Sequence, residues 1–168
     1  MKDLELLPDS DSHPDILIAW VTQMLETKQE SWAWLTGWVE HLPRQHANWT
    51  SLTAFGLPLL QACMEAGLDQ YFRAGQSMAH IIFSTAEEHN LEKYDPPPPR
   101  ITVRFDPVRQ LWLIAWSYRN LHFSEPDRES PVDSETAFPV LKSYLADLWR
   151  GTRPDENLPL PLAQINNC

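Results

Sequence analysis

The chain has few of the residues on which catalysis, metal binding and disulfide bonding depend. Its 168 residues include two Cys, five Gly and six scattered His, with no paired Cys-x-x-Cys, no glycine-rich phosphate loop and no dinucleotide-binding fingerprint. Cys63 lies within an apolar helical pattern and Cys168 is the last residue, so we expect reduced thiols and no disulfide framework. The sequence predicts no metal site and no cofactor.

Long apolar runs and excess positive charge are also missing. No run approaches the ~20 apolar residues of a membrane span, and residues 1–8 lack the basic and then apolar layout of a signal peptide. The formal net charge is -10, which repels nucleic-acid phosphates. We therefore expect a cytoplasmic protein that binds neither membranes nor nucleic acids. Ordinary solubility is the simpler explanation of the acidic charge, but if a partner exists, a basic protein is favoured.

What the chain has in excess is large aromatic side chains. Eight Trp are present, and five of them fall within the first third of the sequence. Trp is enriched in protein cores and interfaces, whereas catalysis needs titratable groups that converge. The composition thus predicts a packing or binding protein. Its length suits a single domain over residues 1–168, with extended or mobile termini at 1–13 and 152–168.

The hydrophobic pattern predicts an α+β fold. Up to about residue 89, apolar residues recur at helical spacing and predict an N-terminal bundle of about four helices, over 12–25, 31–42, 51–66 and 69–89. Beyond Pro96–Pro99 the spacing alternates, which predicts a small antiparallel sheet of two or three strands with a hairpin at 100–118. A C-terminal helix then runs from Pro139 to Trp149 and ends at Gly151.

Within the hairpin, the two faces of the strands differ. A pairing of Asp106 with Arg109 across the turn places one set on the core face, namely Ile101, Val103, Trp112 and Ile114. The opposite face is half apolar and half arginine, with Thr102, Arg104, Leu111 and Leu113. Because the second strand is apolar on both faces, we expect it to be central; a third strand over 121–123 is an option.

The arginine-bearing face suits a protein partner, a second copy or the C-terminal helix. Arg100 and Arg104 belong to a region with only one acidic residue between positions 100 and 119. Pairing of these arginines with the acidic helical half is preferred over an external anion site.

Two further features suggest binding. Trp34 and Trp38 form an aromatic stripe on the predicted helix 31–42, beside a core stripe that includes Trp32 and Leu35. If the second stripe is exposed it marks a homodimer or partner interface, and the alternative is burial under the tail. The segment 125–135 is an acidic loop. The candidate partner-binding residues are Trp34, Trp38, Arg100, Arg104, Asp127 and Glu129.

The leading hypothesis is a non-enzymatic acidic cytoplasmic interaction module, a neutraliser of or adaptor for a basic protein, with no catalytic residue. The sequence Gly75-Gln76-Ser77-Met78-Ala79 is one residue short of a nucleophile elbow and falls within a predicted helix. The alternative is a small hydrolase-like enzyme with a cleft between helices and sheet. It requires His80, His122, Glu87 or Glu88 to converge with an arginine in that cleft.

Overall fold

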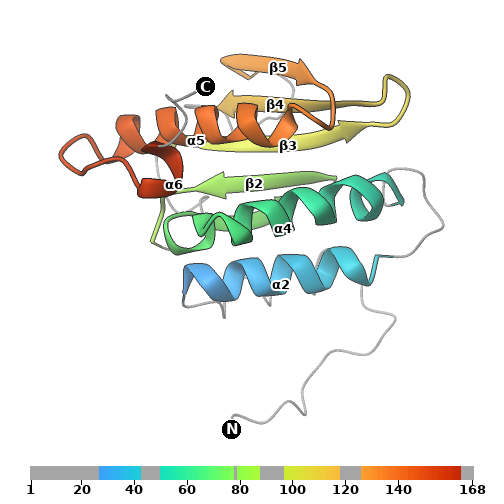
Figure 1. Cartoon of the computed structure of the whole chain (residues 1–168), viewed down its shortest axis with the longest axis horizontal. Helices are drawn as coiled ribbons and strands as arrows, with labels where there is room; N and C mark the ends of the chain where they lie inside the picture. Colours follow the sequence, from blue (N-terminus) through green and yellow to red (C-terminus); the bar gives the residue numbers. More distant parts are fainter. Residues whose placement is uncertain (1–26, 43–49, 78, 88–96, 118–125, 164–168) are drawn as a thin grey trace, which may run out of the picture.

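The computed structural model describes residues 27–42, 50–77, 79–87, 97–117 and 126–163. Their central feature is a five-stranded antiparallel sheet in the order β1-β2-β3-β4-β5, so that each strand pairs with the next one along the chain. The strands are β1 (Arg73–Ser77), β2 (His80–Ser84), β3 (Arg100–Asp106), β4 (Leu111–Ser117) and β5 (Arg128–Val132). Figure 1 shows β5 at one side of the sheet and α2 beyond the other.

The helices form a second layer. They are α2 (Lys28–Glu40), the π-helical turn η1 (Leu52–Gly56), α4 (Leu57–Glu65), the 3-10 turn η2 (Leu68–Gln70), α5 (Ala137–Thr152) and α6 (Leu160–Ala163). In Figure 1, α4 and α5 lie over the sheet, and α2 runs beside α4. None of the described helices combines the length and the apolar character that crossing a membrane requires.

A capping box starts α2. The amide of Glu30 donates to the Thr27 hydroxyl at 3.1 Å, and the amide of Thr27 donates to the Glu30 carboxylate at 2.8 Å. The helix predicted over 31–42 therefore begins earlier than expected, at Lys28. Ser31 is buried, and its hydroxyl accepts a hydrogen bond from the amide of Ala74 at 3.0 Å, which fastens α2 to β1.

The core lies between the helices and one face of the sheet. The indole of Trp32 donates to the carbonyl of Phe72 at 2.7 Å and packs against the ring of Phe83 at 5.3 Å. The largest fully buried core side chains from helices, turns and strands include Trp32, Leu35, Leu60, Leu68, Phe72, Phe83, Ile101, Trp112, Ile114 and Leu141. The tail beyond α5 also contributes, because Leu162 of α6 is buried in the same cluster.

The predicted N-terminal bundle of about four helices is wrong. Residues 69–89, read as the fourth helix, contain the end of η2 and the hairpin of β1 and β2. Gly75 weakens a helix by about 1 kcal/mol, and the alternating burial of Ile81 and Phe83 fits a strand with one face on the core. A short apolar run satisfies both periods, and here the strand period applied. The helix predicted over 12–25 lies outside the described residues.

The prediction of two or three strands is also wrong, since the described sheet has five. The hairpin at 100–118 is present as β3 and β4, with the expected faces, but its register differs by two residues. Asp106 pairs with Leu111 rather than with Arg109. Its carboxylate instead accepts from the amides of Val108 and Arg109, and Gln110 takes a left-handed φ of 55°, which lengthens the turn.

The β4 strand is central, as its composition predicted, because it pairs with β3 and β5. Trp112 and Ile114 are buried on the helix side, and Leu113 and Ala115 are buried on the opposite side. Part of the predicted acidic loop 125–135 is strand β5. The optional strand over 121–123 lies outside the described residues.

Candidate functional site

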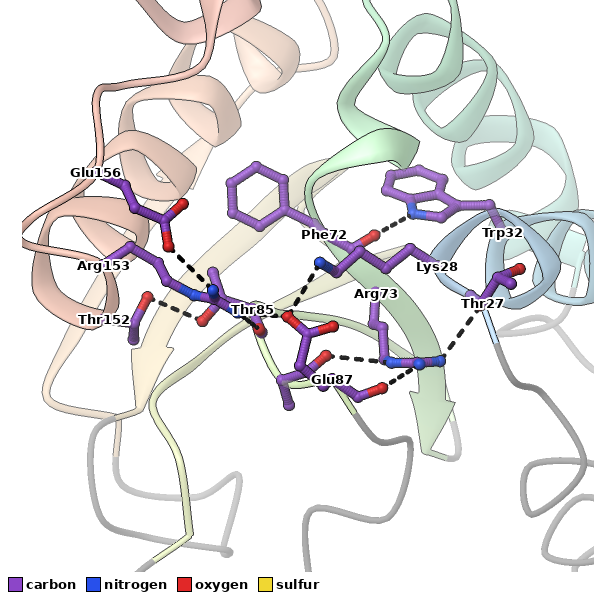
Figure 2. A network of polar contacts seen from close by, with 11 residues as sticks. Thr27, Lys28, Trp32, Phe72, Arg73, Thr85, Glu87, Thr152, Arg153 and Glu156 are labelled. Carbon is purple, nitrogen blue, oxygen red and sulfur yellow. Dashed lines mark hydrogen bonds and ion pairs between the residues drawn. The ribbon is translucent and has the colours of Figure 1, made fainter.

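A polar cluster joins α2, β1, the end of β2 and the end of α5 (Figure 2). Arg73 of β1 is only 4% exposed. Its guanidinium donates to three backbone carbonyls, those of Thr27 at 3.3 Å, Ala86 at 3.1 Å and Glu87. Arg73 therefore holds the start of α2 against the segment that follows β2, with its charge directed at carbonyl dipoles.

Glu87 receives two cations in the same cluster. Its carboxylate accepts from Arg153 at 2.5 Å and from Lys28 at 3.3 Å, as Figure 2 shows. The hydrogen bond from Arg153 is the main reason why the pKa of Glu87 lies below its ordinary value. Arg153 also binds the carbonyl of Thr85 and the carboxylate of Glu156, each at 3.1 Å. A general acid must be protonated before it can donate a proton. A carboxylate whose ionised form is favoured in this way is better suited to structural ion pairs that connect two elements.

The groups proposed for an enzyme are not brought together among the described residues. His80 begins β2, whereas Glu87 lies three residues beyond its end and pairs with Lys28 and Arg153. Burial and the neighbouring Arg104 lower the pKa of His80. Glu88 and His122 lie outside the described residues. Ser77 ends β1 ahead of strand β2 rather than a helix, which is not the geometry of a nucleophile elbow.

Within the part of the chain that the structure describes, no group of three or more His, Cys, Asp or Glu side chains is placed to hold a metal ion. The thiol of Cys63 is buried, and burial raises its pKa. This cysteine is therefore a protonated core residue rather than a nucleophile.

The indole pair, Trp34 and Trp38, lies on α2. The two rings stack with centroids 6.2 Å apart and planes 15° apart, and both side chains are half-buried at the border of the core. Between them, Gly37 leaves open space, because a Cβ placed there would meet no atom within 4 Å. Ala33 and Glu40, on the outer side of the same helix, are exposed.

Arg100 and Arg104 share the face of β3 that is turned away from the core cluster, as strand alternation predicted. Arg100 is only 3% exposed, and burial lowers its pKa. Arg104 is half-buried and lies beside Leu113 of β4.

Four exposed carboxylates lie in the segment around the edge strand β5, one just before the strand, one within it and two in the loop into α5. We call this set the acidic ridge: Asp127, Glu129, Asp133 and Glu135. The cation within it, Arg128, donates to Asp147 of α5 at 3.1 Å and lies over the ring of Tyr144 at 3.9 Å. The positive charge of Arg128 is thus shared with α5.

An apolar pocket of about 180 Å³ opens at the end of the ridge formed by Asp133 and Glu135, which flank its lining residue Ser134. Its lining comes from η1, α4, β4, the loop before α5 and the start of α5, and consists of Phe55, Pro58, Leu59, Ala62, Trp112, Ser134, Ala137 and Phe138. Ser134 is the polar member of this lining, and none of the eight side chains titrates near neutral pH. The pocket can exclude water from an apolar group, but its own lining offers no acid or base.

The six predicted partner-binding residues do not form one surface. The indole pair belongs to α2, which packs on β1, whereas Asp127 and Glu129 belong to the β5 side, the opposite edge of the sheet. Sequence reasoning missed the pocket. Its available signal was Pro58 shortly after Phe55, inside the predicted helix 51–66.

Comparisons with known proteins assign no family to the chain. A scan against family models, a search of curated proteins and a search of solved structures each found no match. The geometry and chemistry of the described residues are therefore the basis for a functional proposal.

Proposed function

We propose that the chain is a non-enzymatic, acidic cytoplasmic module that binds a basic protein partner through the acidic ridge. The observation that carries the proposal is a set of four exposed carboxylates, two of which, Asp133 and Glu135, flank Ser134 in the lining of an apolar pocket with no titratable side chain. A surface of one charge sign steers a partner of opposite charge, and an apolar depression supplies the burial that gives an interface its affinity. A charged surface and an apolar depression are sufficient to neutralise or recruit a basic protein.

Charge reversal on the ridge tests the proposal. The variant Glu129→Lys/Glu135→Lys changes two exposed side chains, and the tagged protein is used to capture partners from its native cytoplasm. We expect the wild-type chain to retain a basic protein, increasing salt to weaken the complex, and the variant to lose it with an unchanged far-UV circular dichroism spectrum.

The matched control is Glu40→Lys/Asp155→Lys, which makes the same change in net charge at exposed positions away from the ridge. It should retain the partner. Retention by the ridge variant, or equal loss in both variants, would refute a ridge-specific interaction.

A second candidate function is self-association through α2. The stacked, half-buried indole pair and the open space at Gly37 favour it, because close packing of a second helix needs both large apolar area and a small residue. This candidate involves a surface separate from the ridge, so both can hold in one molecule.

A further inference from the structure

We infer that the pocket beside the acidic ridge is an anchor site for a single apolar side chain, Leu or Phe, which the partner presents between Lys or Arg residues. This inference rests on the proposed function and specifies the sequence that the ridge recognises.

The volume of the pocket sets the size of the occupant. Pockets for drug-sized ligands and cofactors hold ~300–1,000 Å³, whereas this one holds about 180 Å³. It is several times larger than the ~30 Å³ share of one water molecule. Its lining has Ser134 as the polar side chain, so a nucleotide or another polar ligand would find few groups to replace its water. One apolar side chain fits both the size and the chemistry.

The wall of the pocket is held in place before any ligand arrives. Phe55, from the π-helical turn η1, stacks on Phe105 of β3 with centroids 4.2 Å apart. Phe105 in turn meets Trp112 edge to face at 5.2 Å. Two of these three rings, those of Phe55 and Trp112, line the pocket. A preformed apolar wall reduces the entropy lost on binding, and single π-helical turns are frequent at functional sites.

The charge at the mouth of the pocket determines which residues of the partner would flank the anchor side chain. Ser134 lines the pocket, and Asp133 and Glu135 are joined to it directly, with consecutive Cα atoms about 3.8 Å apart. Both carboxylates are exposed. The ammonium of Lys142 lies 5.0 Å from the ring of Phe138, which also lines the pocket. The ridge side of the mouth is therefore anionic, and Lys or Arg beside the anchor would be attracted to it.

The test measures binding of labelled short peptides to the full chain by fluorescence anisotropy. One peptide has Lys and Arg around a central Leu, and its matched partner has Gly at the centre. We expect the Leu peptide to bind about tenfold or more tightly than the Gly peptide, because an apolar side chain is removed from water. In Ala62→Phe, where the new ring fills the pocket, the two peptides should bind equally while the affinity for the Gly peptide is unchanged.

Two further variants keep the test decisive. Ser134→Phe covers the mouth from an exposed position and serves if Ala62→Phe does not fold. Ala33→Phe adds the same ring on the exposed side of α2 and should leave the preference for Leu intact. Equal binding of the Leu and Gly peptides to the wild type, or loss of the preference in Ala33→Phe, overturns the anchor site. Failure of both peptides to bind at low salt overturns the proposed function itself.

Discussion

Trp112 links the fold to the pocket. It is 1% exposed, it contacts Phe105 edge to face, and its ring forms part of the pocket lining. Its burial was predictable from the sequence, because it alternates with Ile114 on the face that matches Ile101 and Val103. Its place beside a pocket was not predictable, because that depends on η1 and α5, which are distant in sequence.

We expect Trp112→Ala to destabilise the fold by about 3–5 kcal/mol, since removal of a buried indole leaves a cavity that its neighbours fill only in part. Urea denaturation followed by circular dichroism measures the loss. Val108→Ala, in a turn where the side chain is 90% exposed, is the control and should change stability little. A melting temperature unchanged by the tryptophan replacement would show that the core is assembled differently.

Glu87 provides a prediction with a defined pH dependence. Its pKa in the folded protein lies below the ordinary value, chiefly because Arg153 donates to it. The ion pairs therefore stabilise the fold above about pH 4.3, the ordinary pKa of Glu, and this contribution is lost as the pH falls through the lower folded-state pKa. Because the side chain is 67% exposed, we expect Glu87→Gln to cost only about 0.2–1 kcal/mol at pH 7.

Urea denaturation at a series of pH values checks this. The stability difference between wild type and Glu87→Gln should shrink toward zero as the carboxylate is protonated. Glu65→Gln, at an exposed position at the end of α4, should show no such convergence. A difference that persists at acidic pH would mean that Glu87 acts through packing rather than charge.

At the scale of elements, helix α2 contains a glycine, Gly37, that the stability of the helix itself does not explain. Gly37 costs helix stability, yet a Cβ there would meet nothing within 4 Å. We expect Gly37→Ala to raise the stability of the monomer by about 1 kcal/mol in chemical denaturation. If α2 meets a second copy closely at this point, the same change should weaken self-association in sedimentation. A destabilised monomer would show that the surroundings of Gly37 are tighter than the structure indicates.

Elements differed in how well the sequence predicted them. The β3–β4 faces and the end of α4 at Gly67, which has a positive φ of 75°, followed local chemistry. The β1–β2 hairpin did not, because the apolar run Ile81, Ile82 and Phe83 is compatible with either period over so short a stretch, and pairing with β3 decides between them. The register of the β3–β4 turn depended on hydrogen bonds that the Asp106 carboxylate accepts from the amides of Val108 and Arg109, which periodicity does not encode.

At the scale of the whole molecule, the predicted binding residues separate into two surfaces. The indole pair belongs to α2, which packs on β1, and the acidic ridge belongs to the β5 segment at the opposite edge of the sheet. Figure 1 shows α2 and β5 on opposite sides of the molecule. The sequence shows that both features exist, but their separation follows from the strand order. Sites that share no contacts contribute independently to the free energy. The two proposed interactions should therefore be separable by mutation.

We expect Trp34→Ser/Trp38→Ser to lose self-association in analytical ultracentrifugation while the monomer still folds and binds the basic Leu peptide with wild-type affinity. The core stripe of α2 stays intact in this variant, because the fully buried Trp32 and Leu35 are untouched. Glu129→Lys/Glu135→Lys should show the reverse, with self-association kept and peptide binding lost. If the tryptophan variant fails to fold, the indole pair belongs to the core, and the interface on α2 is refuted. If one variant abolishes both interactions in folded protein, the ridge and the indole pair act as one surface, which the five-strand order argues against.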